Sequence, residues 1–116
     1  MKLYLAGPMR GVPYFNFPAF TKAAIQLRTQ GHTVFNPAEQ DDVTYGRDIS
    51  EGNFWGRVDQ AEREYGFNLR EALGRDTAWI CAHAEGVALL PGWEGSKGAQ
   101  AEKALAEALG LKVFYL

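Results

Sequence analysis

Four short apolar runs, three of them closed by glycine or proline, constrain the fold of this chain most strongly. They are KLYLAG at residues 2–7, HTVFNP at 32–37, GVALLP at 86–91 and KVFYL at 112–116. Runs of this kind are typical of short buried strands. Because stretches with helical periodicity separate them, the pattern favours a parallel sheet. We expect a single α/β domain over residues 1–116, with an open, mainly parallel sheet of Rossmann-like or flavodoxin-like type and flanking helices.

The stretch NFPAFTKAAIQLRTQGH, residues 16–32, has the pattern of an amphipathic helix. Asn16 is placed as an N-cap, Pro18 falls in the first turn and Gly31 marks the C-terminal stop. Apolar residues at helical spacing predict the buried side, which comprises Phe20, Ala24 and Leu27, with Ala23 beside them. The side predicted to face solvent comprises Lys22, Gln26 and Thr29.

The remaining connections between the predicted strands comprise one expected loop and two or three expected helices. The polar, glycine-punctuated stretch from Ala38 to about Gly56 shows no sustained period, so we expect a loop with irregular turns. Residues 57–84 predict one or two helices with an interruption near Gly66. Residues 96–110, SKGAQAEKALAEALG, predict an Ala-rich helix.

Charge and composition exclude several classes of function. The net charge of −2 and a pI near 5.6 provide no basic surface for duplex nucleic acid. No stretch approaches the roughly 18 apolar residues that a membrane span needs. Cys81 is the single cysteine and there are two histidines, so we expect no metal site, no disulfide within the chain and a reducing, cytoplasmic location.

Three loops are expected to form one binding site. In open α/β sheets, ligands bind outside the carboxyl ends of the strands, where the strand order reverses. The sequences AGPMRG, NPAE and PGWEGSKGA follow the first three predicted strands. Because carboxyl ends of parallel strands meet at one edge of the sheet, these loops should converge.

Glu102 is the unusual residue of the last predicted helix. At about 100° per residue, one side of this helix gathers Ala101, Leu105, Ala108 and Leu109, and the opposite side Gln100, Lys103 and Glu107. Glu102 lies about 130° from the centre of the polar side, which points its carboxylate inward. A solvated glutamate at the stripe's edge is the alternative. One turn earlier, Gly98 leaves room for a ligand, and Ser96 with the first free N–H groups forms a site suited to an anion.

Several short segments of the sequence resemble those of a known family. They are YLAGPMRG, NFPAF, GHTVFNPAE, LGRDTAWI and VALLPGWEGSKGAQAEKALAEALG, which together cover most of the chain apart from about residues 40–71. The chain resembles the nucleoside 2-deoxyribosyltransferase-like superfamily, in particular its short phage and bacterial members of the DUF4406 type. It is similar, more distantly, to the 2′-deoxynucleoside 5′-monophosphate N-glycosidases.

The resemblance implies roles for three residues. Glu102 matches a nucleophile that attacks C1′ of the deoxyribose, six residues after the loop serine, here Ser96. Asp76 matches the group that assists departure of the base, although a helix cap or a surface charge is the plain alternative. Tyr4 matches a tyrosine that orients the nucleophile, against the alternative of an ordinary core tyrosine.

The resemblance also bears on whether the substrate is phosphorylated. Arg10 matches the position at which the monophosphate N-glycosidases hold a 5′-phosphate, and a guanidinium suits phosphate oxygens. Pro8 replaces the serine that assists phosphate binding in those hydrolases and resembles the nucleoside transferases instead. A plain surface arginine is the alternative for Arg10.

Four further residues are candidates for contact with the substrate. Gly7 is expected to permit close backbone approach, and Asn36 and Glu39 to touch base or ribose unless they serve turn chemistry. Trp93, in a turn after Pro91, is expected to stack on a base or to pack at a subunit interface.

The resemblance implies an enzyme that cleaves the N-glycosidic bond through a covalent glycosyl-Glu102 intermediate and passes the sugar to another base or to water, without a cofactor. The alternative is a non-catalytic module that binds or sequesters a nucleotide in the same pocket. Relatives complete their pockets with residues of a neighbouring subunit, so we also expect a homodimer or higher homo-oligomer.

Overall fold

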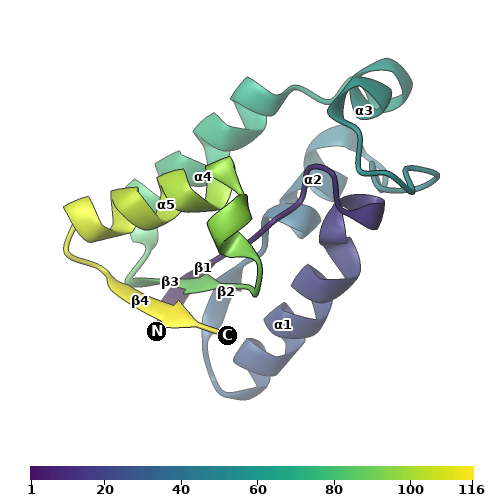
Figure 1. Cartoon of the computed structure of the whole chain (residues 1–116). Helices are drawn as coiled ribbons and strands as arrows, with labels where there is room; N and C mark the ends of the chain where they lie inside the picture. Colours follow the sequence, from purple (N-terminus) through teal and green to yellow (C-terminus); the bar gives the residue numbers. More distant parts are fainter.

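Four parallel strands form the central sheet in the order β2-β1-β3-β4. The computed structural model describes residues 1–116 (Figure 1). Its strands are β1 (Lys2–Ala6), β2 (Thr33–Phe35), β3 (Gly86–Leu89) and β4 (Lys112–Tyr115). All three pairings are parallel, with Leu3 opposite Val34 on one side and opposite Gly86 on the other. The expected open parallel sheet is therefore confirmed, with β1 in its interior.

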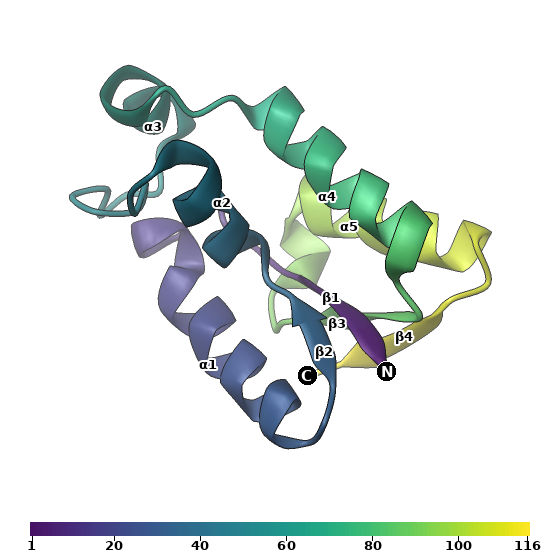
Figure 2. The ribbon, with the colours of Figure 1, turned by 180° about the vertical axis from the view of Figure 1, so that it is seen from behind.

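Five helices surround this sheet. They are α1 (Phe17–Thr29), α2 (Pro37–Tyr45), α3 (Val58–Tyr65), α4 (Leu69–His83) and α5 (Lys97–Ala108). Figures 1 and 2 show α1 on one side of the sheet and α4 with α5 on the other, while α3 lies beyond the carboxyl end of β1. No helix combines the length and the apolar character needed to cross a membrane.

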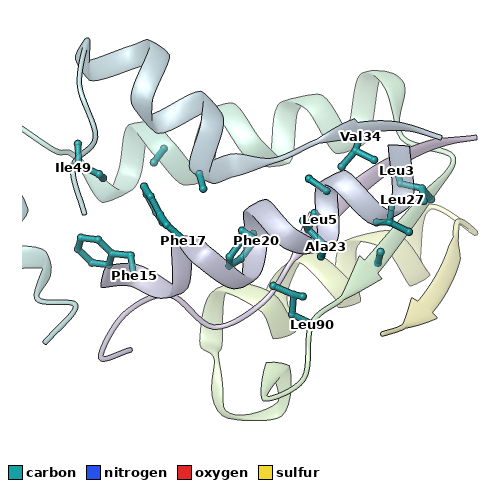
Figure 3. Packing of buried hydrophobic residues seen from close by; sticks show 14 of the residues in the cluster. Leu3, Leu5, Phe15, Phe17, Phe20, Ala23, Leu27, Val34, Ile49 and Leu90 are labelled. Carbon is teal, nitrogen blue, oxygen red and sulfur yellow. The ribbon is translucent and has the colours of Figure 1, made fainter. Parts of the chain in front are cut away.

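Alternate residues of β1 point to opposite faces and divide the core in two. Leu3 and Leu5 pack against the buried side of α1 (Figure 3). Tyr4 and Ala6 belong to the second cluster, together with residues of α4 and α5. The predicted buried side of α1 is confirmed at Phe20, Ala23, Ala24 and Leu27, and its predicted outer residues are exposed.

The predicted cap at Asn16 is wrong in its mechanism. Asn16 precedes α1, but its side chain makes no capping hydrogen bond and its backbone is left-handed, with φ of 60°. Tyr14 and Phe15 have the same hand, with φ of 54° and 53°. The three residues form a left-handed turn that L-residues adopt only at a cost of about 1–2 kcal/mol each. Such a turn has no signature that would separate it from an ordinary N-terminus.

The loop expected over Ala38–Gly56 is wrong in its first half, which forms α2. The Asn36 side chain caps this helix by accepting a hydrogen bond from the Ala38 N–H at 2.9 Å. The buried residues of α2 are Pro37, Ala38 and Asp41. This inner side is short and contains a carboxylate, so the sequence shows no apolar stripe. Residues 46–57 are irregular, as expected.

The two helices around Gly66 are confirmed, whereas the inner side of α5 differs from the prediction. Gly66 follows α3 with φ of 71°, a conformation that suits glycine at a helix C-terminus. In α5 the buried residues are Ala99, Glu102 and Ala106, while Ala101, Ala108 and Leu109 are exposed. Alanine occupies both sides of this helix, so it does not mark the direction of the core. The inward direction of Glu102 is confirmed.

Candidate active site

A cavity of about 110 Å³ lies at the carboxyl ends of β1 and β3. The chain leaves β1 towards β2 on one side of the sheet and leaves β3 towards β4 on the other, which is the switch point at which α/β sheets bind ligands. Residues from the loop after β1, from the start of α2 and from the entrance of α5 line the cavity. The expected convergence of the three loops is confirmed.

Glu102 and Tyr4 form the polar centre of this cavity. Glu102 projects from α5 and is 6% exposed, and Tyr4 projects from the middle of β1. The Tyr4 hydroxyl donates a hydrogen bond to Oε2 of Glu102, whereas Oε1 has no hydrogen-bond partner in the chain. The Tyr4 ring stacks on Phe35 with 5.5 Å between centroids. Tyr4 is thus both a core residue and a ligand of the carboxylate.

Burial decides the acidity of Glu102. Removal from water raises its pKa to about 8, since the hydrogen bond from Tyr4 opposes this change only in part and the charge of Asp76 adds to it. The pKa of Tyr4 is raised well above its usual value by burial and by the two neighbouring carboxylates. Tyr4 therefore stays protonated and acts as a hydrogen-bond donor to Glu102.

Asp76 is a buried residue within α4 rather than a helix cap or a surface charge. It is 7% exposed and lines the same cavity. Arg75 directs two donors at one of its oxygens, with Nε 2.9 Å and Nη2 2.7 Å from Oδ1. Burial raises the pKa of Asp76, while the charge and hydrogen bond of Arg75 and the Tyr4 hydroxyl oppose the rise. Oδ2 accepts no hydrogen bond from Arg75.

Arg75 connects this pair to a third carboxyl that the sequence analysis did not identify. Its Nη2 lies 2.9 Å from Oδ1 of Asp41, which projects from α2 into the cavity lining and is 4% exposed. Burial raises the pKa of Asp41 to about 7 despite Arg75. Asp41 escaped notice because α2 was not predicted. No group of three His, Cys, Asp or Glu side chains is arranged to hold a metal ion.

Four of the predicted substrate-binding residues line the cavity: Gly7, Arg10, Ser96 and Gly98. Arg10 is exposed and has no ion-pair partner. The Ser96 hydroxyl caps α5 by accepting the Ala99 N–H at 3.2 Å. A Cβ on Gly98 would meet open space, whereas one on Gly7 would lie 2.7 Å from the Leu90 Cβ. The absence of a side chain on Gly7 thus permits the loop after β1 to pack closely against Leu90.

The other predicted contacts do not line the cavity. Asn36 is 0% exposed and its side chain caps α2, so its carbonyl oxygen serves the backbone. Pro8 packs near Gly92, whose hypothetical Cβ would lie 3.3 Å from the Pro8 Cγ. Trp93 packs against Tyr115 of β4, with Lys103 above its ring.

Glu39, also considered for base or ribose, forms an ion pair with Arg28 on α1 at 2.6 Å. That pair lies outside the lining of the cavity.

The segment 40–71, whose role the sequence left open, supplies much of the apolar wall. Besides Asp41, its contributors to the cavity lining are Ile49, Val58, Phe67 and Leu69. Phe15, which the left-handed turn directs inward, joins them, and Figure 3 shows it near Phe17 and Ile49. Apolar side chains on these walls suit the faces of a planar ring. Ile49 and Phe67 lie in irregular stretches, and Val58 and Leu69 are the first residues of α3 and α4, so no periodicity could have marked them.

Comparison with known proteins places most of the chain in one family model. A model described as "Domain of unknown function (DUF4406)" matches residues 1–115. No curated protein and no solved structure matches the chain. The family description names no activity, so the resemblance to nucleoside 2-deoxyribosyltransferases stays a prediction.

Proposed function

We propose that this chain, which belongs to the DUF4406 family, is an enzyme that cleaves the N-glycosidic bond of a 2′-deoxynucleoside or its 5′-monophosphate. The observation that carries the proposal is the buried Glu102 carboxyl at the cavity wall, with Tyr4 on one oxygen and Asp76 nearby. A carboxylate without a cationic partner is costly to bury and is often retained for chemistry. The resemblance to deoxyribosyltransferases supplies the reaction.

In the first step Glu102 acts as the nucleophile. Tyr4 occupies Oε2, so the free oxygen Oε1 forms the bond to C1′ while the C1′–N bond breaks. The electron pair of that bond goes to the base nitrogen. In the reacting form Glu102 is ionised and Asp76 carries the proton, a form that burial favours and Arg75 opposes, and Asp76 gives this proton to the departing base. The product is a glycosyl ester of Glu102 and a free base.

In the second step the ester is resolved by water or by another base. The ionised Asp76 takes a proton from the incoming O–H or N–H group, whose oxygen or nitrogen forms the new bond to C1′. The C1′–O bond to Glu102 breaks and returns its electron pair to the carboxylate. Whether the product is free deoxyribose or a new nucleoside depends on which acceptor enters the cavity.

Arg10 supports a place for a 5′-phosphate within this proposal. It lines the cavity and has no ion-pair partner, and the entrance of α5, with its backbone N–H groups, lines the same cavity. If Arg10 holds the phosphate, the unaltered protein should prefer monophosphates to nucleosides. Arg10→Gln should lose this preference and still cleave nucleosides. An equal loss for nucleosides and monophosphates would contradict it.

A non-catalytic nucleotide-binding module is the second candidate, and one observation favours it. With a pKa of about 8, Glu102 is largely protonated at pH 7 and could serve as a hydrogen-bond donor to a ligand. Nucleotide binding by calorimetry that is weakened by Glu102→Ala, without release of base by the unaltered protein, would support this candidate over the enzyme.

We further propose a homodimer or higher homo-oligomer in the cytoplasm. β4 forms one edge of the sheet, and Phe114, Tyr115 and Leu116 are exposed on it. The free, exposed Cys81 supports a reducing compartment. A monomer in analytical ultracentrifugation at assay concentration would contradict the oligomer.

The enzymatic proposal is tested by incubating the protein with a panel of 2′-deoxynucleosides and their 5′-monophosphates and measuring free base by chromatography. A second free base in the mixture distinguishes transfer from hydrolysis. Glu107→Ala is the matched control for Glu102→Ala, because Glu107 lies on the exposed side of α5. If the unaltered protein releases no more base than Glu102→Ala, the proposal fails.

A further inference from the structure

One guanidinium holds two carboxyls of the cavity in place. Arg75 directs Nε and Nη2 at Oδ1 of Asp76, and the same Nη2 at Oδ1 of Asp41. Its Nη1 donates to the Thr44 hydroxyl at 3.2 Å. The contacts with Asp76 and Asp41 all use Oδ1, so Arg75 fixes both carboxyls through one oxygen each.

The second oxygen of Asp41 has no partner in the protein. Oδ2 makes no hydrogen bond within the chain. It is also not one of the fully buried polar atoms that lack a partner, so it keeps some accessible surface. Asp41 is nonetheless almost buried and lines the cavity. A nearly buried carboxylate oxygen that faces a cavity is a strong hydrogen-bond acceptor for whatever occupies the cavity.

The polar groups form a chain that gives Asp41 a place relative to the reacting atoms. Glu102 contacts Tyr4, whose hydroxyl also lies near Asp76, and Arg75 then joins Asp76 to Asp41. In this series of polar contacts, Asp41 is therefore the residue farthest from Glu102. The cavity that Asp41 lines also has apolar walls, to which Ile49, Phe67 and Leu69 contribute.

We propose that Asp41 determines base specificity by accepting a hydrogen bond from an exocyclic amino group of the leaving base. The site then selects amino-bearing bases, such as adenine and cytosine, over their oxo counterparts. This inference rests on the proposed function for the placement of the sugar at Glu102. An oxo group would place its oxygen against the Asp41 oxygen and leave this acceptor unpaired. An unpaired buried polar group discriminates between ligands more strongly than apolar contacts do.

The charge on Asp41 fixes the condition for the measurement. Three charged groups act on it, namely Arg75, Asp76 and Asp42, and its pKa is about 7. At pH 8 the carboxyl is mostly ionised and can only accept hydrogen bonds. We therefore expect the amino preference to be fully developed at that pH.

Asp41→Asn offers a test that reverses the preference rather than removing it. Arg75 has only donors, so it will hold the carbonyl oxygen of the new side chain and leave the amide NH₂ facing the cavity. The group that meets the base thereby changes from acceptor to donor. The protein should favour deoxyadenosine over deoxyinosine, and deoxycytidine over deoxyuridine, by about ten- to a hundredfold in kcat/KM at pH 8. The Asn variant should favour the oxo member of each pair.

Two further variants and a binding measurement complete the experiment. Asp42→Asn makes the same chemical change on the next residue, which lines a different groove, and should keep the amino preference. Asp41→Ala should have no preference. Calorimetry with free adenine and hypoxanthine reads the same selection without turnover.

The outcomes separate this inference from the proposed function. Cleavage of all four nucleosides without an amino preference, or with a preference that Asp41→Asn does not reverse, overturns the role of Asp41 and leaves the enzyme. No cleavage, but tighter binding of adenine that reverses to hypoxanthine in Asp41→Asn, supports Asp41 as the base-reading residue and removes the enzyme. No cleavage together with no selective binding overturns both.

Discussion

The Tyr4 hydroxyl and the Glu102 carboxyl are hydrogen-bonded although 98 positions separate them in the chain. Tyr4 belongs to the central strand and Glu102 to the last helix, so the pair joins the sheet to the layer that covers it. Because the bond uses Oε2, it also selects which carboxylate oxygen remains open to the cavity. This single hydrogen bond therefore both ties α5 to the sheet and leaves Oε1 as the oxygen of Glu102 without a partner.

Tyr4→Phe should lower the rate of base release and shift its pH dependence. The ring can keep its stacking on Phe35, but Glu102 loses the hydrogen bond that lowers its pKa. The proposed mechanism requires Glu102 to be ionised, so the rate for the unaltered protein should rise with pH towards about 8. In Tyr4→Phe the rate should fall by about tenfold or more and its rise should move to higher pH. A pH profile of kcat/KM measures both. Tyr115→Phe, at the edge strand, is the control, and a uniform loss without a shifted profile would contradict the role.

The free energy of unfolding should fall as pH rises from about 4.5 to 8, and Glu102→Gln should reduce that fall. Glu102 has a raised pKa in the folded protein, so the folded state retains a proton that the unfolded state has released within this window. The associated stability is complete below the unfolded pKa and is lost as pH rises through about 8. Relative to the unaltered protein, Glu102→Gln should become more stable by a few kcal/mol between pH 4.5 and 8.5. Urea titrations at several pH values measure this difference, and a difference that does not change with pH would refute the raised pKa.

Arg75→Gln should destabilise the protein, and more at pH 8 than at pH 5. Without the guanidinium, Asp41 and Asp76 lose their shared donor, and their ionised forms become costly as pH rises. The expected loss at pH 8 is about 1–3 kcal/mol. Arg57→Gln removes an exposed ion pair with Asp59 and should leave the urea midpoint unchanged. Equal effects of the two substitutions would mean that the Arg75 contacts add nothing beyond surface charge.

Alanine at two glycines should have opposite effects. In Gly7→Ala the new methyl would lie 2.7 Å from the Leu90 Cβ, which should destabilise the protein by about 1–3 kcal/mol. In Gly98→Ala the methyl meets open space at the cavity lining, so helix α5 gains up to about 1 kcal/mol while the cavity loses room. Thermal unfolding and nucleotide titration together distinguish the two. A Gly98→Ala protein with undiminished ligand binding would show that the ligand does not approach this turn.

The strands and the inward glutamate could be predicted because local signals specify them. The runs of β1 and β3 are apolar and closed by turn residues, and parallel pairing follows from the alternation with helices. Glu102 was correctly predicted to point inward because a carboxylate near an apolar stripe is conspicuous. Of the other residues predicted on that inner side, Leu105 packs against the core, whereas Ala101, Ala108 and Leu109 are exposed. The buried Ala99 and Ala106 look no different in sequence from the exposed Ala101.

What the sequence could not provide depends on contacts between distant segments. Asp41 becomes a cavity residue because α2 forms on an Asn36 cap and Arg75 reaches it from α4. Ile49 and Phe67 line the cavity from segments without periodicity. Such residues gain their roles from tertiary packing, which no window of the sequence displays.

The interior position of β1 has a consequence for folding. β1 is the first strand in the chain, yet its pairing with β3 joins Leu3 to Gly86. During synthesis one edge of β1 waits unpaired for most of the chain, and closing so long a loop slows the search for native contacts. The cavity, whose walls run from Tyr4 to Glu102, cannot exist in a partly made chain. Any small molecule that fills it binds only the completed protein and therefore stabilises the whole fold, as a pharmacological chaperone does.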